Sequence, residues 1–280
     1  MAEATLAQLL HEARVLGLDR FDAQALAAHA LQQPRAWLIA HADEPLAADT
    51  AARLRTLLRR RADGEPLAYL TGWRGFHGLE LQVTPAVLDP RPDTETLVDW
   101  ALGLLAGELS GIAKPQVADL GTGSGAIALA VAQGCPRAAL RAVDASAEAL
   151  AVARANGQRL GLPVQWLQGS WWQPLGAPPL HLALSNPPYL GADDPHLPAL
   201  RHEPRAALVP AAGDALADLR AIVAGAAPHL APGGWLLLEH GHEQAEAVRG
   251  LLGAAGLADA CTRADLAGRP RCSGARRPPA

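Results

Sequence analysis

The chain has 280 residues, of which 50% are apolar and 19% are charged, and its formal net charge is −4. This length allows one large domain and a small one, and the apolar share excludes global disorder. The mild negative charge argues against a protein that holds nucleic acid by phosphate neutralisation alone, because such proteins carry a basic excess.

Cysteine usage and hydropathy narrow the class further. Cys135, Cys261 and Cys272 are widely spaced and form no C-x-x-C pair, so they fit neither a disulfide framework nor a zinc site. We therefore predict reduced thiols and no metal. No charge-free run approaches the roughly 20 residues of a membrane span, and the first residues lack a signal-peptide block. These features predict a cytoplasmic protein without a membrane partner.

Residues 1–72 predict a small helical bundle. Apolar residues recur at helical spacing from Thr5 to about Arg61, and Pro34 and Pro45 divide the stretch. The stretch contains neither a glycine-rich loop nor a cluster of catalytic residue types. The arginines between Arg53 and Arg61 are typical of a solvated helix face, with a partner-binding patch as the alternative.

Residues 73–92 predict a β-hairpin that links this bundle to a second domain, residues 93–280. Glycines interrupt short apolar stretches here, and Leu79-Glu80-Leu81-Gln82-Val83 alternates as a half-buried strand does. A helix is expected from about Thr94 to Leu105, with Asp93 or Thr94 as its cap.

From Pro115 onward, apolar strands alternate with helices, which predicts an α/β domain with a mainly parallel sheet covered on both faces. We expect seven strands, with the last two short: Gln116–Leu120, Leu140–Asp144, Val164–Leu167, Leu180–Ser185, Trp235–Glu239, Ala258–Arg263 and a stretch around Cys272. The expected helices are Ala126–Gln133, Ala147–Leu160, Ala215–His229 and Glu243–Ala255. Pro232-Gly233-Gly234 is expected to be a turn, and the tail Ala275–Ala280 is expected to fray.

A glycine-rich loop follows the first of these strands. Asp119-Leu120-Gly121-Thr122-Gly123-Ser124-Gly125 places three alternate glycines between strand and helix, where the backbone must turn sharply and approach a ligand. Asp144 ends the second strand about 20 residues later, where a carboxylate accepts both hydroxyls of a ribose. Together they predict a nucleoside-containing cofactor across the strand ends, with a tight turn that binds nothing as the alternative.

The spacing of the loop favours one cofactor over another. A dinucleotide fold needs G-x-G-x-x-G, whereas this loop reads G-x-G-x-G and follows Asp119. A carboxylate there would repel a pyrophosphate and would suit the ammonium and sulfonium of S-adenosylmethionine. The sequence therefore favours this methyl donor over NAD.

The fourth strand ends in Asn186-Pro187-Pro188-Tyr189. Two consecutive prolines cannot donate to a ladder, so the strand stops there, at the edge where open α/β sheets bind ligands. The Asn186 side-chain oxygen and the Pro187 carbonyl could accept both hydrogens of an –NH2 group, and Tyr189 could press on its flat face. A proline-rich loop without a ligand is the alternative.

These motifs resemble the class I S-adenosylmethionine-dependent methyltransferases that modify planar amino groups. Tyr69-Leu70-Thr71-Gly72, Arg91-Pro92-Asp93-Thr94-Glu95 and Leu237-Leu238-Glu239-His240-Gly241 narrow the likeness to the release-factor glutamine methyltransferases (PrmC/HemK). The family implies a Rossmann-like domain that methylates the amide nitrogen (N5) of the glutamine in the Gly-Gly-Gln motif of bacterial class I release factors. S-adenosylmethionine is the implied donor and S-adenosylhomocysteine the product, and the amino-terminal helices help to bind the protein substrate.

The resemblance also implies roles for individual residues. Gly121, Thr122, Gly123, Ser124 and Gly125 would surround the methionine end of the cofactor, Asp144 would hold the ribose, and Trp171 would lie against the adenine. Asn186, Pro187, Pro188 and Tyr189 would hold the glutamine. The chain departs from the family at Ser170, where an acidic residue is common, and at Gly268–Arg276, which only loosely follows the usual closing strand.

An amide nitrogen is a poor nucleophile, so the predicted task of the site is to hold it in line with the donor methyl and exclude water. Acceptors on its two N–H bonds would favour a pyramidal nitrogen, and no general base is needed. The nearest alternative is a methyltransferase that acts on adenine N6 in nucleic acid, but the small helical domain is not strongly basic. We expect release factors as partners, no direct nucleic-acid binding, and a monomer.

Overall fold

The computed structural model describes residues 4–279, which divide into two compact units. One unit runs up to Trp73 and includes Pro198–His202, and the other comprises Arg74–Leu197 and the chain from Glu203 onward. The smaller unit holds five helices: α1 (Leu6–Val15), α2 (Arg20–Leu31), α3 (Arg35–Ala40), α4 (Ala48–Ala62) and α5 (Leu67–Thr71). The predicted helical bundle is therefore confirmed.

The helical bundle packs around leucines and is tied together by ion pairs. Thr5 caps α1 by accepting from the Gln8 backbone, and the Gln8 side chain accepts from Thr5 in return. Two of the predicted surface arginines bind carboxylates on other helices, Arg55 to Glu12 at 2.9 Å and Arg61 to Asp22 at 2.6 Å. These arginines thus hold helices together within the unit.

The larger unit begins with a hairpin of β1 (Trp73–Phe76) and β2 (Leu79–Gln82), whose first residue belongs to the smaller unit. The 3-10 turn Pro92–Thr94 leads into helix α6 (Glu95–Ala106). Neither predicted cap forms a side-chain bond to the helix end. The Thr94 hydroxyl is instead the acceptor for Asn186, 92 positions away.

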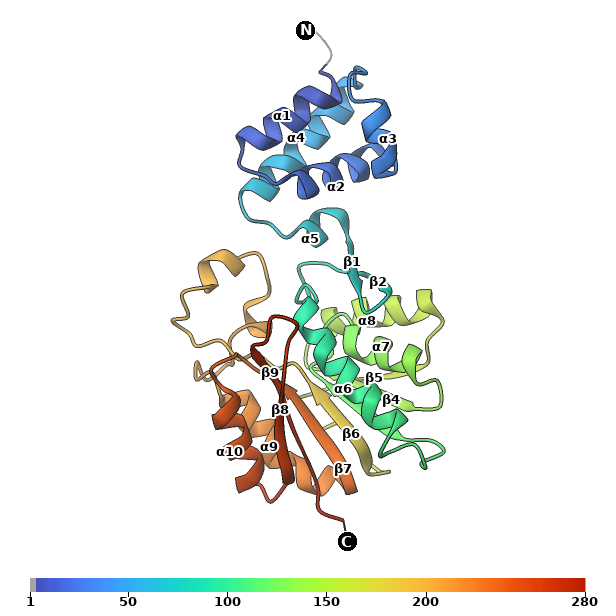
Figure 1. The fold of residues 1–280 in the computed structure, drawn as a ribbon, viewed down its shortest axis with the longest axis vertical. Coiled ribbons are helices and arrows are strands. Elements are labelled where there is room, and N and C mark those ends of the chain that lie inside the picture. The colour runs from blue at the N-terminus through green and yellow to red at the C-terminus, as the bar shows by residue number, and fades with distance from the viewer. Residues whose placement is uncertain (1–3, 280) are drawn as a thin grey trace. The chain divides into compact units, whose positions relative to one another are not determined.

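The seven strands of the predicted sheet are all present, and most of them are parallel (Figure 1). They are β3 (Gln116–Leu120), β4 (Ala139–Asp144), β5 (Val164–Gln168), β6 (Leu180–Ser185), β7 (Leu230–Glu239), β8 (Ala258–Ala264) and β9 (Pro270–Arg276). Their order across the sheet is β5-β4-β3-β6-β7-β9-β8, with β9 antiparallel to both of its neighbours. The Rossmann-like fold class is confirmed.

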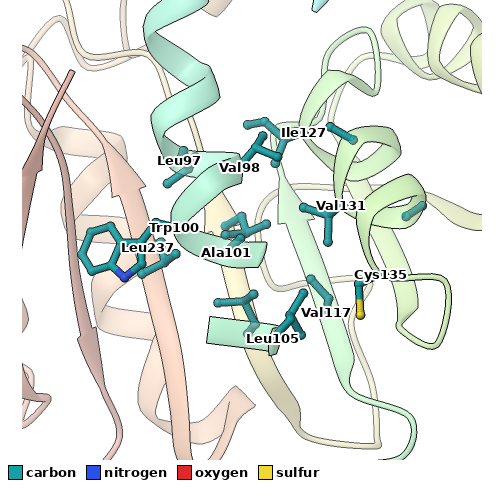
Figure 2. Packing of buried hydrophobic residues seen from close by; sticks show 14 of the residues in the cluster. Leu97, Val98, Trp100, Ala101, Leu105, Val117, Ile127, Val131, Cys135 and Leu237 are labelled. Atoms are coloured by element: carbon teal, nitrogen blue, oxygen red, sulfur yellow. The ribbon is translucent and has the colours of Figure 1, made fainter. Parts of the chain in front are cut away.

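Helices cover both faces of this sheet, because the central strands are apolar on each side. On one face lie α6, α7 (Ala126–Gly134) and α8 (Ala147–Leu160), and on the other lie α9 (Ala217–His229) and α10 (Ala245–Ala254). Figure 2 shows Val98 of α6 beside Ile127 of α7, and Leu105 of α6 beside Val117 of β3. Each face has its own buried cluster, so strands β3 and β6 are fixed from both sides.

Two local expectations were wrong. Pro232-Gly233-Gly234 lies within β7 and is not a separate turn, since Gly233 N and Gly234 O both bond to the Arg277 backbone at 2.9 and 2.8 Å. The first residues of the tail that we expected to fray, Ala275 and Arg276, belong to β9, and Ala275 is fully buried. Ala280 lies outside the described residues. Both errors arose because the pairing partner is distant in sequence.

The helices of residues 4–279 include none that is both long and apolar enough to cross a bilayer. The three cysteines, Cys135, Cys261 and Cys272, are free, as predicted.

Candidate active site

A cavity of about 500 Å³ opens at the carboxyl ends of the central strands, within the larger unit. This volume is in the range of small-molecule sites. The loops that follow β3, β4, β5 and β6 all contribute to its wall, as expected for the ligand-binding edge of such a sheet. Other residues complete it: Pro85–Leu88, Pro90 and Thr94 after the hairpin, a stretch from Pro204 to Ala211, and Asp218.

The glycine loop forms the floor of the cavity. Gly121, Gly123 and Gly125 have φ of +74°, +55° and +84°, a region that side chains rarely adopt. The backbone N–H groups of Gly121 and Thr122 both donate to the Val143 carbonyl, at 2.8 and 2.9 Å, which ties the loop to the end of β4. A Cβ at Gly123 would meet nothing within 4 Å, so this residue leaves room for a ligand.

Asp144 stands at the end of β4 and lines the cavity. Its Oδ2 accepts from Gly123 N at 2.8 Å and its Oδ1 accepts from Ser146 N at 2.9 Å. Each carboxylate oxygen can accept more than one hydrogen bond, so both oxygens still have capacity for hydroxyl donors. The carboxylate is therefore held in one orientation with its remaining lone pairs available to a diol.

Asp119 occupies a different place from the one that the sequence suggests. It is fully buried beneath the glycine loop and does not line the cavity. Its Oδ2 accepts from Thr122 Oγ1 at 2.6 Å and from Ala128 N at 3.2 Å, which braces the loop from below. Burial raises the pKa of this carboxyl to about 7, against the opposing effect of the Thr122 hydrogen bond. Its direct contact with a cofactor stays a prediction.

The turn after β5 carries the predicted adenine contact. Trp171 lines the cavity at a φ of +47°, and a Cβ at Gly121 would lie 3.2 Å from its ring. Trp172 points elsewhere, since it is buried and its Nε1 donates to Ile222 O in α9 at 2.9 Å. The turn therefore presents one tryptophan to the cavity and uses the next one to anchor itself.

Asp218 also lines the cavity, and sequence reasoning missed it. It lies one turn before Ile222 on α9, the helix that contacts the Trp172 anchor. Burial raises the pKa of this carboxyl. The only available signal was its place in the first turn of a helix that follows the Asn-Pro-Pro-Tyr loop, which is too common a feature to indicate a site.

The Asn-Pro-Pro-Tyr loop enters the cavity with only part of its length. Asn186 and Pro188 line it, whereas Pro187 and Tyr189 do not. The Asn186 Nδ2 donates to Thr94 Oγ1 at 3.2 Å, and no donor among residues 4–279 reaches its Oδ1 or the Pro187 carbonyl. The two predicted acceptors are thus without partners, and their contact with a substrate amide stays a prediction.

Tyr189 is largely occupied by contacts away from the cavity. Its Oη donates to Glu239 Oε1 at 3.4 Å, and its carbonyl accepts from Gln244 Nε2 at 3.0 Å. Burial, followed by the nearby Glu239 charge, raises the pKa of the phenol, which therefore stays protonated and remains a donor. A stacking role for this ring on a bound amide has no support from its position here and stays a prediction.

Glu239 is a second residue that motif reasoning left without a role. It ends β7 after three consecutive leucines and is 1% exposed. Burial raises the pKa of its carboxyl to about 7, and the nearby Thr94 and Tyr189 hydroxyls and the charge of Arg271 act in the opposite direction. Its Oε1 accepts from Tyr189 Oη, whereas its Oε2 has no hydrogen-bond partner among the described residues. A carboxylate at the carboxyl end of a wholly apolar strand was the signal that could have identified it.

This chain is similar to known proteins over nearly its whole length. A family model described as the PrmC N-terminal domain matches residues 3–72, and one described as the methyltransferase small domain matches residues 94–202. The curated protein named release factor glutamine methyltransferase from Burkholderia pseudomallei is 51% identical, over 98% of this chain and 97% of its own. Proteins of the same name from Bordetella pertussis (51% identical; 92% and 95% covered) and Vibrio cholerae (44%; 96% and 94%) are also similar.

Solved structures at low identity share the fold. A T. thermophilus 16S rRNA methyltransferase in complex with AdoMet and guanosine is 19% identical and has a TM-score of 0.54, covering 73% of this chain and 49% of its own. A methyltransferase from Pyrococcus furiosus is 14% identical with a TM-score of 0.50, covering 83% and 100%.

Proposed function

The chain belongs to the release factor glutamine methyltransferase family and is an enzyme of that kind, and we propose the residues that perform its reaction. The substrate nitrogen is the N5 amide nitrogen of the glutamine in the Gly-Gly-Gln motif of bacterial class I release factors. The methyl donor is S-adenosyl-L-methionine. The observation that supports these assignments is that one cavity joins the glycine loop, Asp144 and the Asn186 side chain.

The chemistry of the cofactor fits the residues that line this cavity. S-adenosylmethionine, when bound, supplies an electrophilic methyl group on a positively charged sulfur. Asp144 binds the two ribose hydroxyls with the lone pairs that Gly123 and Ser146 leave free. The open space at Gly123 admits the chain of the cofactor, and Trp171 offers an aromatic face to its base. The cavity thus has a separate position for the ribose, the chain and the base of the cofactor.

The substrate amide is held by acceptors alone. Asn186 Oδ1 and the Pro187 carbonyl each accept one N–H of the glutamine side chain, and both are without donors among residues 4–279. This arrangement directs the nitrogen lone pair away from the two acceptors. It also stabilises the pyramidal nitrogen of the transition state more than the planar amide. The amide proton leaves to solvent after methylation, so no base is assigned.

The test combines a methylation assay with a binding measurement. Wild-type protein should transfer labelled methyl groups to a purified release factor, and not to the same factor with its Gly-Gly-Gln glutamine replaced. Asn186→Ala should reduce turnover by a factor of about 100 or more, since it removes an acceptor used in the transition state. Its affinity for S-adenosylhomocysteine, measured by calorimetric titration, should stay within a few-fold of wild type.

Two outcomes would contradict this assignment. One is near-normal methylation by Asn186→Ala. The other is equal labelling of the release factor and its glutamine variant, which would place the methyl group on another atom. Labelling of DNA or RNA in a parallel reaction would favour an adenine-directed enzyme, the alternative that the same four residues allow.

A further inference from the structure

Three carboxylates among residues 4–279 line the cavity, and they differ in what already binds them. Asp144 accepts from two backbone N–H groups, and Glu148 is exposed in the first turn of α8. Asp218 is half-buried in the first turn of α9, and no hydrogen bond or ion pair within the described chain reaches its carboxylate. Withdrawing a carboxylate from water without a donor costs free energy, so a ligand that donates to Asp218 would offset that cost.

Asp218 lies at the end of the cavity that Trp171 borders. Helix α9 is fixed to the turn after β5, because Trp172 Nε1 donates to Ile222 O at 2.9 Å and a Cβ at Gly225 would collide with the Trp172 ring. Residues four positions apart share one face of a helix, so Asp218 projects from the same face as Ile222. Trp171 packs against the buried cluster that contains both Trp172 and Ile222. Asp218 and Trp171 therefore belong to one end of the cavity.

The base of the cofactor belongs at this end. Trp171 is the only aromatic residue among the described residues that line the cavity, and a planar base packs well against an aromatic face. Asp144 holds the ribose at the end of β4 and the glycine loop takes the amino-acid chain, so the base is the part that remains for Trp171. Adenine carries an exocyclic amine, which is a hydrogen-bond donor, at the edge of its ring.

We propose that Asp218 recognises the adenine of S-adenosylmethionine by accepting a hydrogen bond from its exocyclic amine. The turn beside Trp171 supplies only the hydroxyl of Ser170, so Asp218 is the carboxylate available at this end. An ionised carboxylate accepts and cannot donate, so it binds an amine and repels the oxygen that a 6-oxo base carries at the same position. Asp218 thus determines specificity for the cofactor. This inference rests on the proposed function and extends it to the base of the methyl donor.

Two other groups of the cofactor also donate hydrogen bonds, its ammonium group and its ribose hydroxyls. Both are present unchanged in S-inosylhomocysteine, an analogue of S-adenosylhomocysteine in which an oxygen replaces the exocyclic amine of the base. Comparing the affinities of these two ligands therefore isolates the contact with the amine from the contacts with the ribose and the amino-acid chain.

Calorimetric titration of the wild-type chain with both ligands is the first test. We expect S-adenosylhomocysteine to bind roughly 100-fold more tightly, because it gains a charge-assisted hydrogen bond while S-inosylhomocysteine places an oxygen against the carboxylate. Titration at about pH 8 keeps the carboxylate ionised. Equal affinities for the two ligands would overturn the proposal, and this measurement does not depend on the folding of any variant.

Asp218→Asn is the direct test at the residue itself. The asparagine amide has the same shape, is a weaker acceptor, and can turn to donate to the oxygen of the 6-oxo base. We expect the affinity for S-adenosylhomocysteine to fall roughly tenfold or more and the affinity for S-inosylhomocysteine not to fall, so the preference shrinks. Equal losses for both ligands would place Asp218 against the ribose or the ammonium group, and an unchanged preference would show no contact with the amine. Either result would overturn the proposal.

Asp214→Asn is the matched control, because it removes one negative charge close to the start of the same helix. Asp214 is exposed, does not line the cavity, and binds the Arg220 side chain and the Leu216 backbone N–H. We expect the ligand preference of this variant to equal that of the wild type. The same loss of preference in both variants would assign the effect to charge near the helix start and overturn the proposal.

Methylation kinetics separate a failure of this inference from a failure of the proposed function. In Asp218→Asn, most of the loss in kcat/KM for S-adenosylmethionine should appear as a higher KM, because the base is bound alike in the ground state and the transition state. A wild-type chain that prefers S-adenosylhomocysteine but methylates no release factor would contradict the proposed function alone. A wild-type chain that methylates the release factor and binds both ligands equally would contradict the inference alone.

Discussion

The two sides of the cavity are held in place by different kinds of contact. On the cofactor side, Gly121, Thr122 and Gly123 bond to Val143 and Asp144 at the end of the adjacent strand β4. On the amide side, the Asn186 and Tyr189 bonds reach Thr94, Glu239 and Gln244, which are 92, 50 and 55 positions away. The contacts that hold the proposed cofactor side therefore join two neighbouring strands, whereas the contacts that hold the proposed amide side join residues far apart in the chain.

The largest predicted effect comes from a substitution in the glycine loop, on the cofactor side of the cavity only. Gly125→Val introduces a Cβ 3.0 Å from Trp166 and 3.1 Å from Leu129, at a φ of +84°. Crowding and left-handed strain together should lower the free energy of unfolding by about 3 kcal/mol or more, as urea denaturation would measure. Gly123→Ala is the control, because it has positive φ and open space and should cost only about 1–2 kcal/mol. Equal losses would show that packing at Gly125 is unimportant.

The next prediction tests whether the contacts that hold the cofactor side are confined to two neighbouring strands. Asn156 is fully buried on α8, and its amide donates to Ser124 O and Gln82 O and accepts from Gln82 N. Asn156→Leu should destabilise the unit by about 2–3 kcal/mol, because buried backbone groups lose their partners, and should weaken S-adenosylhomocysteine binding. Gln158→Leu on the exposed face of the same helix should stay within about 0.5 kcal/mol of wild type. Unchanged cofactor affinity in Asn156→Leu would show that the neighbouring strands alone hold the glycine loop in place, without support from α8.

The third prediction concerns charge beneath the glycine loop. The pKa of Asp119 is raised to about 7 in the folded protein, mainly by burial, from its usual value of 3.8. Its contribution to stability is therefore complete at low pH and is lost as the pH rises through about 7. Asp119→Asn should remove up to about 1.4 kcal/mol per pH unit from the slope of the free energy of unfolding in this window. Glu239 has a shift of the same sign and would keep its own part, so an unaltered slope would mean that Asp119 is not protonated on folding.

The smallest prediction concerns the amide side. Pro187→Ala leaves the carbonyl acceptor in place and gives the loop more freedom, which is worth about 0.4–1 kcal/mol. A two- to fivefold lower kcat with unchanged S-adenosylhomocysteine affinity is the expected result, measured by methylation kinetics and titration. Pro163→Ala, an exposed proline in the turn before β5, should change neither quantity. A matching loss of cofactor affinity in Pro187→Ala would indicate that the two sides are coupled.

The difference between local contacts on the cofactor side and distant contacts on the amide side also explains which features could be predicted from the sequence. Strands β3 and β6 have the predicted bounds, because a buried parallel strand is a continuous apolar run between turn residues. The glycine loop and Asp144 were found from local spacing alone. The burial of Asp119 was not foreseen, because the residues that cover it come from the loop's own folded conformation.

The contacts of Tyr189 and Thr94 could not be predicted in the same way. The residues that bind them, Glu239, Gln244 and Asn186, become neighbours only when β6, β7 and the 3-10 turn meet at one edge. Thr94 looked like a helix cap because that use is local and common. The strand pairing of Gly233 and Gly234 with Arg277 was missed for the same reason, since the partner lies more than 40 positions along the chain.

The position of β9 has a consequence for how the enzyme is made. This strand follows β8 in the chain but lies between β7 and β8, so β8 has no partner in the sheet until β9 has left the ribosome. A nascent chain at that stage already contains Glu239 but lacks Cys272, its partner in the pairing of β7 with β9. The edge of β7 next to Glu239 is therefore expected to stay unpaired until residues 270–276 have been synthesised.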